Sequence, residues 1–95
     1  MKLVAATLAA LMAVTAAQAV EAPPGATACS GCHPGSAGVD TAATRLIGMK
    51  AEDILAAMVA YRSGARLATV MDRIAKGFSE PEAAAIANWY ATQSN

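Results

Sequence analysis

Residues 29–33 read Cys29-Ser30-Gly31-Cys32-His33, two cysteines three positions apart followed directly by the only histidine of the 95-residue chain. C-x-x-C-H is the pattern of covalent haem attachment. Two thiols at this spacing can each add to a vinyl group of one porphyrin and form thioethers, and the adjacent imidazole then offers a nitrogen to the iron. We therefore predict that Cys29 and Cys32 bind one haem c covalently and that His33 is an axial ligand.

Three other interpretations of this motif use its residues less well. A disulfide between Cys29 and Cys32 gives His33 no role and closes a very short loop. A structural zinc ion needs four ligands, whereas the chain holds two Cys, one His and no carboxylates clustered nearby. A thioredoxin-like redox pair belongs to a βαβ context, and no segment of this sequence alternates in the way a strand does.

The N-terminus has the features of a secretory signal peptide. Of residues 1–19, 15 are apolar, and Lys2 is the only charged one. The uncharged run leads to Ala17-Gln18-Ala19, a small-x-small cleavage pattern. A membrane-spanning anchor needs about 20 apolar residues, so a retained, interfacial N-terminus is the weaker alternative. We predict cleavage after Ala19, export to the periplasm, and a single monohaem domain over residues 20–95.

The composition of residues 20–95 predicts a thin core. Without Lys2, the formal charge of this part is −1, which favours neither nucleic acid binding nor a solvated charged tail. Its 76 residues include 18 Ala and only 18 large apolar side chains. A domain of this size is marginally stable alone, and a haem would supply the large apolar body that the core lacks. We expect a protein that does not span the membrane.

Apolar spacing predicts an all-α fold. The clearest helix covers Lys50–Ser63, where Ile54, Leu55, Met58 and Tyr61 form one stripe and Gly64 follows. The last helix, Glu80–Thr92, follows a Ser79-to-Glu82 capping box and places Ala83, Ile86, Ala87 and Tyr90 on one face. Shorter helices are expected over Pro24–Ser30 and Thr69–Lys76, with a loop between His33 and Gly48.

The second axial ligand has three methionine candidates. Because His33 is the only histidine, bis-His ligation within one chain is excluded, and His/Met ligation is the usual alternative. Met58 lies on the apolar helix stripe and Met49 at the entrance of that helix, where both fit a packing role. Met71 follows a loop that can fold over the ring, so position alone favours Met71 without excluding the other two.

From about Thr27 to Thr92 the sequence resembles the class I cytochromes c of bacteria. The likeness rests on C-x-x-C-H, a later x-x-L-x-G at 44–48, Y-R-S-G-x-R at 61–66, T-V-M-D-R-I-A-K-G-F-S-E-x-E at 69–82 and I-A-N-W-Y-A at 86–91. It is greatest to the haem subunit of flavocytochrome c sulfide dehydrogenase. The resemblance implies a small class I cytochrome c fold, with about four short helices around one covalent haem.

The resemblance also implies roles for particular residues. It makes Met71 the distal ligand and matches Trp89 to the aromatic of the last helix, where a plain core role is equally consistent. The chain has Thr44 where the family commonly has Pro, so the carbonyl of Thr44 would have to orient the ligand histidine. Small residues at Gly25 and Ala28 would let the last helix approach closely, against Trp89.

Polar side chains near Met71 are candidates for contacts with the haem propionates. Arg66 is the leading one because it lies in the loop before Met71, and Tyr61 could donate from the preceding helix. A surface role is equally consistent for Arg66 and for the neighbouring Arg62 and Arg73, and a packing role for Tyr61.

The function that the resemblance implies is electron transfer rather than catalysis. The electron donor would be an FAD-containing flavoprotein subunit that oxidises sulfide, and the acceptor another cytochrome. A free-standing carrier between other periplasmic partners is the alternative within this class. The rival class is a haem enzyme or gas-binding module with an open sixth position, for which the sequence offers no second histidine.

Overall fold

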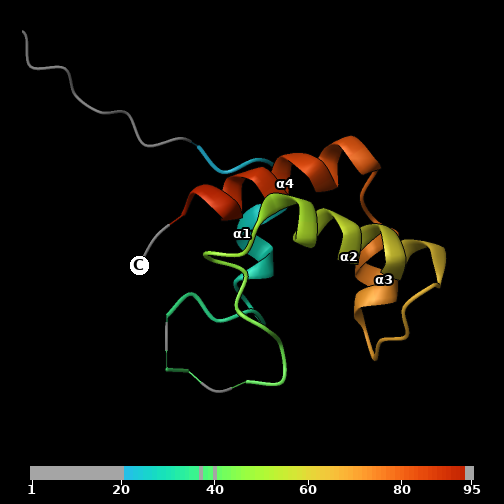
Figure 1. Ribbon diagram of the computed structural model, residues 1–95, viewed down its shortest axis with the longest axis horizontal. Coiled ribbons are helices and arrows are strands. Elements are labelled where there is room, and N and C mark those ends of the chain that lie inside the picture. The colour runs from blue at the N-terminus through green and yellow to red at the C-terminus, as the bar shows by residue number, and fades with distance from the viewer. Residues whose placement is uncertain (1–20, 37, 40, 94–95) are drawn as a thin grey trace, which may run out of the picture.

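Four helices make up the regular structure of the described part of the chain (Figure 1). The computed structural model describes residues 21–36, 38–39 and 41–93. Within those ranges it contains the following helices and no strand: α1 (Ala26–Cys29), α2 (Ala51–Ser63), α3 (Met71–Ala75) and α4 (Glu80–Thr92). The all-α prediction is therefore confirmed, and the two long helices begin and end within one residue of their predicted bounds.

The two long helices pack against each other and form the body of the fold (Figure 1). Their contact buries Ile54 of α2 against the apolar face of α4, where the four predicted positions are all buried: Ala83, Ile86, Ala87 and Tyr90. The predicted capping box is present at the start of α4. Glu82 N–H donates to Ser79 Oγ at 3.3 Å, and Ser79 N–H donates to Glu82 Oε1 at 3.0 Å. Local sequence signals and tertiary burial agree along this helix.

The short helix α1 crosses α4 and brings the cysteine motif onto the core. Gly25 precedes it with φ of 87°, a left-handed conformation that glycine adopts without strain. A Cβ on Gly25 would lie 2.6 Å from Phe78 Cε1 and 3.7 Å from Ile86 Cδ1. The close approach at Gly25 is therefore to Phe78 and Ile86, not to Trp89 as we expected, and Ala28 is exposed. Trp89 is half-buried and packs edge-on against Tyr90.

The remaining helix, α3, packs against α2 at the end away from α1 (Figure 1). It begins at Met71 rather than at the predicted Thr69, because Val70 has φ of −140°, outside the helical region. The predicted loop between His33 and Gly48 holds no helix or strand where it is described.

Two sequence predictions concern the N-terminus. Residues 1–20, which include the predicted signal peptide and its cleavage site, lie outside the described residues. Among the residues described, no helix has the length and apolar character needed to cross a bilayer.

Candidate haem-attachment site

The imidazole of His33 is held by the backbone of the loop that follows it. Its Nδ1 lies 2.5 Å from the carbonyl oxygen of Thr44, so Nδ1 carries the proton and donates. A neutral imidazole that donates from Nδ1 keeps its lone pair on Nε2, the atom then available to a metal ion. The orienting contact expected from Thr44 is present, even though Thr44 stands where the family commonly has Pro.

The two cysteines are free thiols in different surroundings. Cys29 ends α1 and is half-buried, and its Sγ donates to the carbonyl of Gly25 at 3.6 Å. Cys32 lies in the following turn and is exposed. Burial raises the pKa of the Cys29 thiol above its ordinary value, while the polar groups of the nearby backbone and of the Tyr90 side chain act in the opposite direction. Cys29 is thus the cysteine that the fold surrounds.

A hydroxyl group from α4 reaches this same turn. Tyr90 Oη donates to the carbonyl of Ala26 at 2.5 Å, so the hydroxyl of Ser30, 3.0 Å away, donates to Tyr90 Oη. Ala26 and Tyr90 are among the most buried residues of the described chain, 0% and 2% exposed. Burial raises the pKa of the Tyr90 phenol, and the hydrogen bond with Ser30 partly offsets this. The motif between Ala26 and His33 is therefore fixed from α4 as well as from the Thr44 loop.

Met71 stands on a separate helix from the cysteines. It is the first residue of α3 and is half-buried. Three of the five exposed large apolar side chains among the described residues lie in the segment that leads into α3 or in α3 itself: Leu67 (94% exposed), Val70 (51%) and Ile74 (38%). A cluster of exposed apolar side chains on so small a chain indicates a surface that another apolar body covers.

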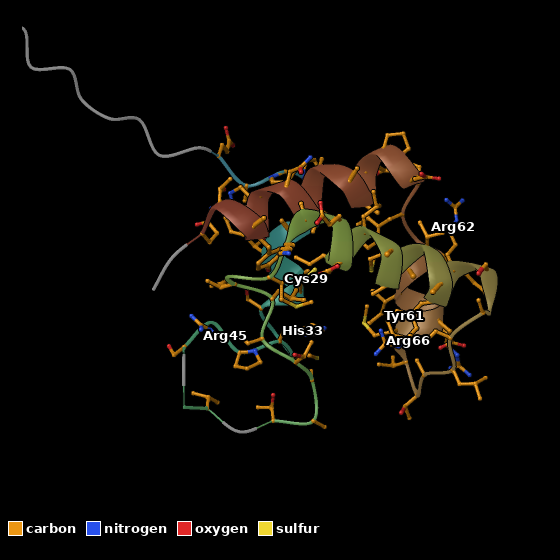
Figure 2. All side chains as sticks on the ribbon, in the orientation of Figure 1. Cys29, His33, Arg45, Tyr61, Arg62 and Arg66 are labelled. Carbon is orange, nitrogen blue, oxygen red and sulfur yellow. The ribbon has the colours of Figure 1, made fainter. Side chains whose placement is uncertain are left out.

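The two candidate propionate contacts lie together. The guanidinium carbon of Arg66 is 4.9 Å from the ring centroid of Tyr61, and Arg66 N–H donates to the carbonyl of Ala60 at 3.1 Å. In Figure 2 both side chains lie on the side of α2 on which Cys29 and His33 also lie, whereas Arg62 lies on the other side. Arg62 and Met58 line a groove of about 330 Å³ between α2, α3 and α4, which Cys29, Cys32, His33 and Met71 do not line.

Three polar groups have a notable environment that the sequence did not predict: the hydroxyl of Tyr90, Nε of Arg45 and Oδ1 of Asp72. Tyr90 was assigned only to a core face, and its hydroxyl had no signal that could locate its partners about 60 residues away. The buried Nε of Arg45 and the buried Oδ1 of Asp72 have no hydrogen-bond partner. Asp72 directly follows Met71, the predicted distal ligand. Arg45 directly follows Thr44, whose carbonyl accepts the hydrogen bond of His33.

No family model matches this chain, and no curated protein matches it. In the described part of the chain, no three side chains of His, Cys, Asp or Glu gather closely enough to hold a metal ion. The assignment of the site therefore rests on the motif and on the contacts described above.

Proposed function

We propose that this chain is an exported monohaem c-type cytochrome of class I that transfers single electrons. The observation that carries the proposal is the hydrogen bond from His33 Nδ1 to the Thr44 carbonyl, within a C-x-x-C-H motif. A histidine that follows two free thiols and keeps its lone pair on Nε2 matches the donor set of a covalently bound haem. A disulfide between Cys29 and Cys32 would need neither His33 nor the hydrogen bond that orients its ring.

The packing of the chain fits a large apolar cofactor. Within the described residues the core holds only seven buried apolar side chains, of which three are larger than alanine: Ile54, Ile86 and Tyr90. The exposed Leu67, Val70 and Ile74 adjoin Met71, the proposed second ligand. A porphyrin bound beside them would bury apolar surface that the protein alone leaves in water, at about 25 cal/mol per Å².

The residues of the chain have distinct tasks in this proposal. Cys29 and Cys32 would hold the haem through two thioether links, and His33 and Met71 would bind its iron. When bound, the haem supplies a one-electron change between Fe(III) and Fe(II). With no open position at the iron, the protein has no place there for a substrate, so the proposed role is that of a carrier and not of an enzyme. Tyr61 and Arg66 are the proposed contacts of a propionate.

The proposed partners follow from the resemblance of residues 27–92 to the haem subunit of flavocytochrome c sulfide dehydrogenase. The donor is an FAD-containing flavoprotein subunit, and the acceptor is another cytochrome. Both are periplasmic, as the signal-peptide pattern of residues 1–19 predicts for this chain. A covalent link to the cofactor suits an exported protein, because a haem held by packing alone can be lost to the surroundings.

The test is a visible difference spectrum of protein made together with haem-maturation machinery, recorded as reduced plus CO minus reduced. We expect c-type bands that CO leaves unchanged, which indicates a six-coordinate iron. Bands that CO alters would place the protein in the class of haem enzymes and gas-binding modules. The absence of c-type bands would overturn the haem proposal and return the motif to a disulfide or a metal site.

A further inference from the structure

The hydroxyl group of Tyr90 has contacts that a core residue does not need. It donates to the carbonyl of Ala26, which precedes Cys29 in α1, and it accepts from the hydroxyl of Ser30, which directly follows Cys29. The same side chain therefore contacts the backbone before Cys29 and the residue after it.

The helix that carries Cys29 needs support from outside. It is four residues long, has no side-chain cap and begins after a left-handed glycine. One isolated helical turn is not stable in water, since its nucleation fixes several dihedral angles for one hydrogen bond. The support comes from α4, which packs against α1, and Tyr90 of α4 makes hydrogen bonds with Ala26 of α1 and with Ser30.

We infer that Tyr90 is a positioning residue for the attachment of haem at Cys29. It holds the thiol of Cys29 in place against α4, whereas the exposed Cys32 depends on it much less. The inference rests on the proposed haem function and adds to it a difference between the two cysteines. The tertiary structure positions Cys29, whereas only the local motif positions Cys32.

The step that Tyr90 assists is the addition of a thiol to a vinyl group. The Cys29 sulfur forms a bond to one vinyl carbon, the thiol proton goes to the other vinyl carbon, and the carbon–carbon double bond becomes single. No electrons enter or leave. The addition needs the sulfur held near one carbon, so the loss of a positioning hydrogen bond slows it without altering its chemistry.

The experiment separates the two cysteines by mutation. In the full chain, Cys32→Ala leaves only Cys29 to react, and Cys29→Ala leaves only Cys32. Each variant, reduced and mixed with ferrous protohaem, is followed by the pyridine haemochrome spectrum, which distinguishes one thioether from none. Tyr90→Phe, which removes only the hydroxyl, is then added to each background.

We expect Tyr90→Phe to slow thioether formation between about two- and tenfold in the Cys32→Ala background, the scale of one hydrogen bond. In the Cys29→Ala background we expect the rate to stay unchanged. Ser79→Ala, which removes a cap of the same helix far from Cys29, controls for general weakening of α4 and should slow neither reaction selectively.

Equal slowing in both backgrounds would overturn the inference, because it would show that Tyr90 supports the fold and not the thiol. An unchanged rate in the Cys32→Ala background would overturn it as well. If the unmutated chain made together with haem-maturation machinery carries no thioether-bound haem, the proposed function itself fails, and that outcome is visible before any tyrosine is changed.

Discussion

The two ends of α2 differ in how completely the protein's own side chains cover them. At the end near α1, Ile54 joins a core in which Ala26, Ala87 and Tyr90 are at most 2% exposed. At the other end, the segment before α3 leaves Leu67 94% exposed and Val70 51% exposed. The half that carries the cysteines is closed by packing, whereas the half that carries Met71 presents apolar surface with nothing of its own to cover it.

This difference indicates that different contacts stabilise the two halves. Hydrogen bonds to Tyr90 and Thr44 fix the cysteine motif from two directions. On the Met71 side, α3 is five residues long, has no side-chain cap and contacts α2. We infer that, in the haem-loaded protein, contacts within the chain hold the cysteine half in place, whereas the haem supplies much of the stability of the methionine half.

Removing both attachment points should have the largest effect. We expect the haem-free double variant Cys29→Ala, Cys32→Ala to be largely unfolded, because seven buried apolar residues make a small core and a ligand bound only to the native state stabilises it. The measurement is a thermal scan by far-ultraviolet circular dichroism. A cooperative transition in the absence of haem would show that the protein contacts suffice for both halves.

Replacing the proposed distal ligand should affect only the methionine half. Met71→Ala should leave the haem attached but open the sixth position, so that CO binds the reduced protein. Met49→Ala and Met58→Ala are the matched controls, since both methionines are half-buried and carry the same thioether. An unchanged spectrum for Met71→Ala, with a change in either control, would move the ligand to another methionine.

Glycine substitutions compare the packing of the two halves directly. Gly25 and Gly64 both have left-handed φ, 87° and 81°, so alanine at either position costs about 1–2 kcal/mol in backbone energy. Only at Gly25 does the new Cβ meet a neighbour, Phe78 at 2.6 Å, while at Gly64 nothing lies within 4 Å. We expect Gly25→Ala to lower the free energy of unfolding by about 1–3 kcal/mol more than Gly64→Ala. Denaturant titration of the haem-loaded variants measures the difference, and equal losses would contradict the close packing of α1.

The smallest effect concerns alkaline pH and the cysteine half. Burial raises the pKa of Tyr90 above its ordinary value of 10.0, so the folded chain holds the phenol proton more tightly than the unfolded chain does. The resulting stability is fully present below the unfolded-state pKa and is lost as pH rises through the folded-state pKa. We expect the denaturation midpoint to fall above about pH 10. The midpoint of the Tyr90→Phe variant should fall less over the same pH range. An equal fall in the variant and the unmutated chain would show that the phenol has no such role.

Much of the fold could be predicted because its signals are local. The last helix has a capping box at Ser79 and an apolar face with a helical period, and both depend on residues three or four positions apart. The second helix ends at Gly64 for the same kind of reason, a left-handed residue after the last turn. The short helices were predicted too long. Their predicted starts were Pro24 and Thr69, but the backbone becomes helical only at Ala26 and Met71.

The candidate site could be predicted only in part. The residues of C-x-x-C-H are adjacent in the chain, so their spacing alone suffices to predict haem attachment. The packing at Gly25 was assigned to the wrong side chain because Phe78 precedes α4 whereas Trp89 lies near its C-terminal end, and no sequence pattern states which of them α1 meets. Arg66 and Tyr61 were both candidates for the same ligand, but the contact between them was not expected.

The sequence by itself therefore determined the two long helices and the C-x-x-C-H motif with its single histidine, because each depends on residues close together in the chain. The tertiary structure alone decided how these parts are held. A backbone carbonyl such as that of Thr44 has no side chain to mark it, and a hydroxyl such as that of Tyr90 finds Ala26 and Ser30 only when two helices more than 50 residues apart cross. Those two contacts arise from the folding of the chain and not from its local pattern.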